Sequence, residues 1–125
     1  MDFDAIYTIL AAIARNGTLL TYGGLSASYH EATGDWHEPH GSWDEPLGQL
    51  NQMLYAAGWP ALSAVVVLQA NGGGFGEPGG GFWESSPNVP ARPANADART
   101  AQWGQLLNAV YAANWPNVMP TTPPV

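Results

Sequence analysis

The sequence predicts an α+β fold, in which three to four helices pack on a small antiparallel sheet. Three long segments place apolar residues three and four positions apart, which is the spacing of one helix face. Residues 62–68 instead form a short apolar run, bounded by Pro60 and Asn71, that has the length of a buried strand. The extended apolar pairs at residues 19–20 and 82–83 are expected to complete the sheet.

The first predicted helix covers residues 3–16. Asp2 or Asp4 can cap its start, and Gly17 can adopt the left-handed conformation that ends a helix. A second helix is predicted over residues 22–32. Thr21 is its N-cap, and it ends at Thr33-Gly34.

The third predicted helix follows Asp44 or Glu45 as its cap and stops at Gly58. The fourth starts near Asp97 and runs to Ala113. Together these elements predict one core, made of Ile6, Leu10, Ile13, Leu47, Leu50, Leu54, Val65, Val67, Leu106 and Val110. With 125 residues, we expect a single globular domain over residues 1–116 and a flexible, proline-rich tail over residues 117–125.

Two helix ends repeat the same residues. Residues 50–60 and 106–116 share Leu, Tyr-Ala-Ala and Trp-Pro at matching offsets. We interpret them as two similar helix ends, with a duplication as the alternative.

The charge balance narrows the classes of partner. The net charge is −7, the chain has no lysine, and its three arginines are Arg15, Arg92 and Arg99. Nucleic-acid binding is disfavoured, because neutralising phosphates needs a basic face. An acidic surface suits a basic protein, a cation, or a small ligand held by stacking.

The chain has no cysteine, so disulfides, thiolate metal sites and cysteine nucleophiles are excluded. The N-terminus is acidic and lacks the basic start of a signal peptide. No apolar run approaches the roughly 20 residues of a spanning helix. We therefore expect a cytoplasmic protein with no membrane contact.

The glycine-rich loop after the predicted strand has two interpretations. Residues 74–79, G-F-G-E-P-G, match the dinucleotide-binding spacing, but Pro78 and the glycines after it prevent the helix that this motif requires. The glycines can let the backbone approach a ligand that stacks on Phe75, Phe82 and Trp83. Alternatively, Phe82 and Trp83 belong to the core and the glycines form a hairpin-like return.

All three histidines lie in one acidic stretch, residues 30–45, together with five of the ten carboxylates. His30, His37 and His40 could supply ligands to a divalent metal, although their spacing matches no tight metal motif. The alternative is a polar loop whose histidines contact neighbouring acids and tryptophans. No serine lies in a nucleophile elbow, so no catalytic nucleophile is predicted.

Residues 21–26, T-Y-G-G-L-S, resemble the T-Y-G-x-[LI]-[AS] turn of winged-helix-like domains, which also occurs in the alkyltransferase-like repair family. Residues 60–67, P-A-L-S-A-V-V-V, and 78–82, P-G-G-G-F, are similar to a small domain family of bacteria and phages. This resemblance implies a winged-helix-like arrangement over most of residues 3–116. It implies no alkyl transfer, because the chain has no cysteine, and the second helix has no arginine or lysine for reading DNA.

We expect a binding site at a mouth between residues 34–46 and 72–83, with no cofactor. Its ligand would be small, planar and nucleotide-derived, as for a phage or bacterial sequestering or anti-defence protein. The predicted ligand-binding residues are Tyr22, Trp36, His37, His40, Trp43, Phe75, Glu77, Phe82 and Trp83. On this hypothesis Trp43→Ala or Trp83→Ala removes binding and leaves the fold intact.

Two alternative functions stay open. One is an acidic interaction module or inhibitor that docks on a basic partner. The other is a metal-dependent hydrolase that uses His30, His37 and His40. A homodimer is compatible with each of them.

Overall fold

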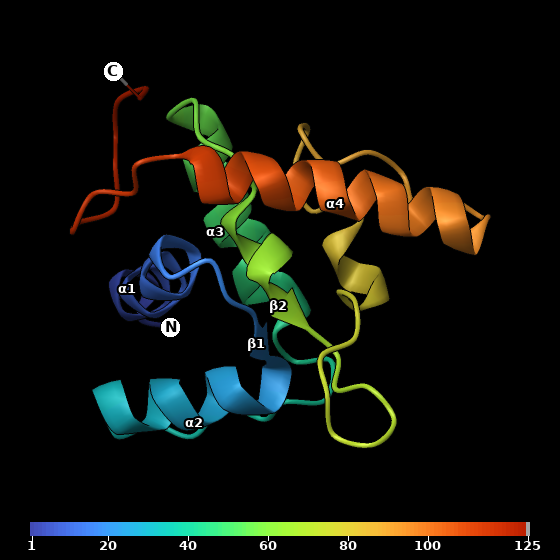
Figure 1. Cartoon of the computed structure of the whole chain (residues 1–125). Coiled ribbons are helices and arrows are strands. Elements are labelled where there is room, and N and C mark those ends of the chain that lie inside the picture. Colours follow the sequence, from blue (N-terminus) through green and yellow to red (C-terminus); the bar gives the residue numbers. More distant parts are fainter. Residues whose placement is uncertain (125) are drawn as a thin grey trace.

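The computed structural model of this protein describes residues 1–124. Across these residues, four α-helices surround a two-stranded sheet (Figure 1). The elements are α1 (Phe3–Arg15), β1 (Leu20–Thr21), α2 (Tyr22–Thr33), α3 (Asp44–Ala56), β2 (Val66–Val67) and α4 (Ala96–Ala112), with 3-10 helices η1 (Leu62–Val65) and η2 (Gly80–Phe82). In Figure 1, α4 crosses the top of the view and α2 the bottom, and the sheet lies between them.

The predicted antiparallel sheet is wrong. Strand β1 pairs with β2 in parallel, with Leu20 opposite Val66 and Thr21 opposite Val67. Most of the predicted strand at residues 62–68 forms η1, and Phe82 lies in η2. The described chain is therefore a helical assembly around one short parallel pair, and the winged-helix-like arrangement is not observed.

Burial explains why residues 62–68 were predicted as a strand. Every residue from Leu62 to Val67 is buried. A run that is buried on all sides has no polar-apolar alternation, so periodicity cannot distinguish a strand from a helix. Because helix α2 begins immediately after Thr21, β1 offers only two residues for pairing, and β2 is equally short.

The four α-helices lie over the predicted segments, and their caps explain why. The side chain of Asp2 accepts a hydrogen bond from the Ala5 amide of α1 at 3.0 Å, and Thr21 does the same for the Gly24 amide of α2 at 3.0 Å. Gly34 ends α2 with a φ of 81°. Helix α3 differs from the prediction, because Trp43 stands at its N-cap and makes no side-chain capping bond.

Helix η1 is the centre of the core, since it contacts α1, α3 and α4. The predicted core residues Ile6, Leu10, Leu47, Leu50, Leu54, Val65, Val67 and Val110 are buried, and Ile13 and Leu106 are partly buried against this core.

The sequence predicts a flexible tail after residue 116. In the structure, residues 117–124 form no helix or strand, bend at residues 117–118 and 121–122, and make defined contacts. Met119 packs against the core, and the indole Nε1 of Trp59 donates to the carbonyl of Thr122 at 2.7 Å. Within residues 1–124, no helix combines the length and the apolar character needed to cross a membrane.

Candidate functional site

The two segments of the predicted mouth do approach each other. The hydroxyl of Tyr22, at the start of α2, accepts a hydrogen bond from the amide of Gly79 at 2.9 Å. Gly81 lies so close to the Asp44 carboxylate that a Cβ at this position would clash with it. The cavity between these residues holds only about 10 Å³, which is about the space of one water molecule. A planar ligand therefore has no room there.

The phenol of Tyr22 is neutral and joins α2 to the glycine-rich segment at this small cavity. Burial raises the pKa of its phenol above the ordinary value, an effect opposed by the Gly79 amide and increased by the charge of Asp44. The hydroxyl therefore stays protonated at neutral pH and fixes the glycine-rich segment to α2.

Trp43 is a core residue, which corrects its predicted role as a ligand contact. Its side chain is fully buried, and its indole Nε1 donates to the hydroxyl of Ser26 at 2.8 Å. Its ring packs against Tyr29 at 5.5 Å and His37 at 4.1 Å between centroids. The Trp43 ring and its N–H group thus both make their contacts inside the protein.

Phe82 and Trp83 are also buried, and their rings contact each other at 5.3 Å. The core interpretation of these two residues fits the structure, and the ligand interpretation does not. The glycine-rich loop forms a hairpin-like return, in which Leu68 donates to Glu77 at 2.8 Å and Gly76 donates to Leu68 at 2.7 Å.

Phe75 and Glu77, two predicted ligand contacts, lie on this hairpin and remain accessible to solvent. Phe75 is 56% exposed and pairs through its backbone with Gln69. The Glu77 carboxylate accepts a hydrogen bond from the Thr100 hydroxyl of α4 at 2.6 Å, so it holds the hairpin to the helix.

The three histidines do not assemble a metal site. His30 faces Trp36, with 6.2 Å between ring centroids, whereas His37 covers Trp43 and bonds through Nε2 with the Ser42 carbonyl at 2.8 Å. The exposed His40 lies 3.9 Å from Glu38. In the part of the chain that the structure describes, no group of His, Asp and Glu side chains could hold a metal ion. The metal-dependent hydrolase therefore lacks its ligand set.

What remains of the predicted site is an exposed surface on residues 34–43, which we call the Trp36 loop. Trp36 itself is 61% exposed. Five exposed carboxylates lie on or next to the loop in the sequence: Glu31, Asp35, Glu38, Asp44 and Glu45. No lysine or arginine occurs in residues 16–91, so the chain near this loop offers these carboxylates no strong cation.

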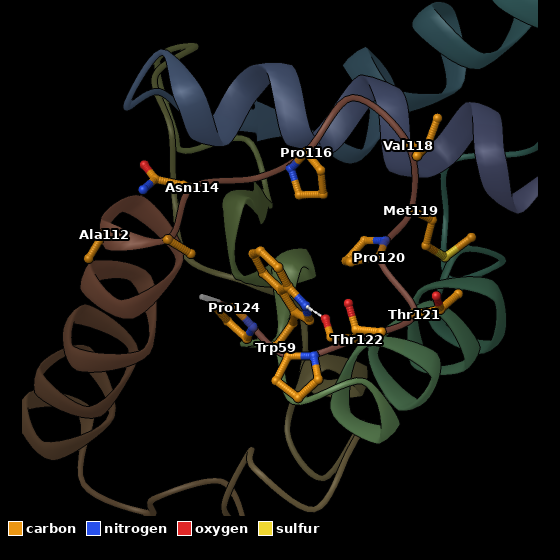
Figure 2. A pocket seen from close by; sticks show the side chains of 12 residues that line it. Trp59, Ala112, Asn114, Pro116, Val118, Met119, Pro120, Thr121, Thr122 and Pro124 are labelled. Atoms are coloured by element: carbon orange, nitrogen blue, oxygen red, sulfur yellow. Dashed lines mark hydrogen bonds between the residues drawn. The ribbon is translucent and has the colours of Figure 1, made fainter.

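A larger, open cavity lies elsewhere, and the sequence did not predict it. It has a volume of about 610 Å³, and Figure 2 shows Trp59, the end of α4 and the C-terminal segment around it. None of its lining side chains is charged. The two repeated Trp-Pro helix ends were a signal for this region, because Trp59 and Trp115 lie against each other with ring centroids 5.0 Å apart.

No protein-family model, curated protein or solved structure matches this chain. The resemblance to the small bacterial and phage domain family therefore stays a prediction.

Proposed function

We propose that this protein is a non-catalytic, acidic interaction module that binds an arginine-rich partner in the cytoplasm through the Trp36 loop. The exposure of Trp36 carries this proposal. A tryptophan left 61% exposed keeps much of its large apolar surface in water. Tryptophan is also among the residues that most often dominate the binding energy of a protein interface.

Internal hydrogen bonds hold the Trp36 loop in place, so it has little conformational freedom to lose on binding. Trp43 anchors one end in the core, and His37 bonds with the Ser42 carbonyl across the loop. The Glu38 carboxylate accepts hydrogen bonds from the His40 amide at 2.8 Å and the Ser42 hydroxyl at 3.2 Å. A preorganised surface loses less conformational entropy when it binds, which increases affinity.

The charge around Trp36 supports a basic partner. Asp35 and Glu38 are exposed within the loop, and Glu31 is exposed just before it. A guanidinium group can stack on the face of Trp36 while it pairs with one of these carboxylates. Lysine is a weaker fit, because its compact ammonium group lacks the planar face that stacks.

A peptide titration tests the proposal. The probes are a peptide of Arg-Gly-Gly repeats, its lysine counterpart and its glutamate counterpart, measured by calorimetry at 50 and 300 mM salt. We expect the arginine peptide to bind most tightly and the higher salt to weaken it. Trp36→Ala should reduce the affinity at least about tenfold, as for an interface anchor.

Two control variants separate this site from general attraction between opposite charges. Phe75→Ala removes another exposed aromatic side chain, and Asp97→Asn removes a carboxylate on α4; neither should change the affinity more than about twofold. Glu38→Gln removes a carboxylate of the Trp36 loop and should weaken binding of the arginine peptide. If Asp97→Asn weakens binding as much as Glu38→Gln does, or Trp36→Ala has no effect, the proposal is wrong.

A small planar ligand is the second candidate function, and the volume of the cavity at Trp59 favours it. A volume of about 610 Å³ lies within the range of small-molecule sites. Because no cationic side chain lines this cavity, its ligand should be uncharged, such as a nucleobase or nucleoside, rather than a phosphorylated nucleotide. We expect adenosine to bind at least about tenfold more tightly than adenosine monophosphate in calorimetry. Tighter binding of adenosine monophosphate, or no heat of binding from either compound, would contradict a small-ligand function.

A further inference from the structure

The last residues of the described chain form what we call the C-terminal strap, residues 117–124. The strap contains Pro120-Thr121-Thr122-Pro123, followed by Pro124, and therefore carries a P-x-x-P sequence. Such sequences favour the extended polyproline II conformation, whose carbonyl groups point outward and are free to accept hydrogen bonds.

Trp59 is the central contact of this strap. Its indole Nε1 donates to the Thr122 carbonyl at 2.7 Å, as Figure 2 shows. The indole ring packs on Trp115, and the Trp59 carbonyl accepts a hydrogen bond from the Asn88 side chain at 3.2 Å. The ring is thus held in place from the protein side, while its N–H points to the strap.

Gly58 provides the place where Pro123 fits. A Cβ at Gly58 would lie 3.3 Å from Cβ and 3.4 Å from Cγ of Pro123, so a side chain there would crowd the proline ring. Gly58 also has a φ of 87°, a conformation that other residues adopt at a cost. The absence of a side chain at Gly58 thus leaves space for the Pro123 ring beside the indole donor of Trp59.

From these contacts we propose that the surface formed by Gly58 and Trp59 is a binding site for P-x-x-P peptide segments, and that the C-terminal strap is its intramolecular occupant. Proline-rich peptides are commonly recognised by a surface lined with aromatic side chains. The prolines pack against the rings, and an indole N–H donates to a carbonyl between them. The expected ligand is thus a P-x-x-P peptide, and the strap shows how such a peptide can bind. This site lies outside the Trp36 loop, so it goes beyond the interaction proposed there. It shares Trp59 with the cavity of the second candidate function, but its ligand is a peptide that takes the place of the strap.

The strap is held weakly compared with the residues just before it. Pro116 is fixed, because its carbonyl accepts hydrogen bonds from the Tyr7 hydroxyl at 2.6 Å and from Arg15 at 2.8 Å. Among the described residues, the bond from Trp59 is the one hydrogen bond between residues 117–124 and the rest of the chain. Val118 is 75% exposed. Chain from residue 117 onward can therefore leave the surface while residue 116 stays in place.

Full-length variants test the proposal. The variant Pro120→Gly/Pro123→Gly weakens the strap without truncating the chain. The probe is a synthetic peptide with the sequence of residues 117–124, and a peptide with glycine at both of these proline positions is its control. Peptide binding is measured by calorimetry. The position of the strap is followed by the indole N–H resonances, of which the chain has six, and Trp59→Phe identifies the one that belongs to Trp59.

In the wild-type chain, we expect little binding of the peptide, because the tethered strap competes at an effective concentration of about millimolar. In the Pro120→Gly/Pro123→Gly variant, the Trp59 resonance should shift as the strap leaves. That variant should then bind the peptide at least about tenfold more tightly than the wild type does. Adding Trp59→Phe, which keeps an aromatic ring and removes the N–H donor, should reduce this binding at least about tenfold.

The other outcomes count against the proposal. A Trp59 resonance that does not move in the Pro120→Gly/Pro123→Gly variant would show that the prolines do not hold the strap. Equal binding of the peptide and its glycine control would remove the P-x-x-P specificity. The five other indole resonances report whether the variant keeps its fold. A wild-type dimer in light scattering that the Pro120→Gly/Pro123→Gly variant abolishes would overturn the intramolecular arrangement, because the occupant would then be the strap of a second copy.

Discussion

Replacing Trp43 by alanine is expected to lower the free energy of unfolding by about 3–5 kcal/mol, the range for truncating a buried tryptophan. The side chain is fully buried, and its loss leaves a cavity beside Tyr29 and α2. The buried Ser26 hydroxyl also loses the indole N–H that it accepts at 2.8 Å. Because small domains have only about 5–15 kcal/mol of stability, this loss would remove a large share of it.

Urea denaturation followed by circular dichroism measures this effect without relying on tryptophan fluorescence. The matched control is Trp36→Ala in the same loop, which should change stability by less than about 0.5 kcal/mol, because its side chain is 61% exposed. Trp43→Phe separates the loss of packing from the loss of the hydrogen bond to Ser26, because it keeps an aromatic ring and removes the N–H group. Its cost in stability should lie between those of Trp43→Ala and Trp36→Ala. Equal costs for Trp43→Ala and Trp36→Ala would contradict the buried position of Trp43.

The comparison of these two tryptophans shows why the helices were predictable and the site was not. The helix boundaries follow from local chemistry: Thr21 caps α2 through its own hydroxyl, and Gly34 ends it in a conformation that glycine favours. Trp36 and Trp43 stand in the same aperiodic, acidic loop, so no local pattern distinguishes them. Only the partner from another element, Ser26 on α2, places Trp43 in the core.

The contacts of the C-terminal strap could not be predicted for the same reason: they depend on residues far away in the sequence. Closely spaced prolines disfavour helices and strands, and this composition predicts a flexible tail over residues 117–125. Docking of the strap depends on Trp59, more than fifty residues earlier, and on the space that Gly58 leaves for Pro123. Such long-range matches leave no periodic trace in the sequence. The repeated Trp-Pro ends marked the two tryptophans that meet there, without indicating what covers them.

A buried polar cluster was also missed, and Asn51 is its centre. Asn51 lies on the buried face of α3, where its Nδ2 donates to the Ser63 hydroxyl at 2.7 Å and the Ser85 hydroxyl at 2.9 Å. Its Oδ1 accepts from the Ser63 amide at 3.2 Å. The amide thus joins α3 to η1 and to the chain that follows η2. In the sequence, Asn51 looks like a solvent-exposed polar residue of an amphipathic helix.

Asn51→Leu should therefore destabilise the protein although leucine has nearly the same size. The Ser63 amide would be left buried without a partner, which alone costs about 1–3 kcal/mol, and two serine hydroxyls would lose their donor. Urea denaturation should show a total loss of at least about 2 kcal/mol. Ser85→Ala is the matched control and should cost about 1 kcal/mol, because it removes a single acceptor.

The sign of the Ser85 effect in the Asn51→Leu background decides between a polar network and simple packing. With Asn51 present, the Ser85 hydroxyl accepts a bond, and removing it destabilises. With leucine at position 51, the same hydroxyl is a buried polar group that has lost this donor, so Ser85→Ala should be neutral or stabilising. If Ser85→Ala costs the same in both backgrounds, the hydroxyl does not act through Asn51. The bond from Asn51 to Ser85 would then add nothing to the stability of the junction between α3 and the chain after η2.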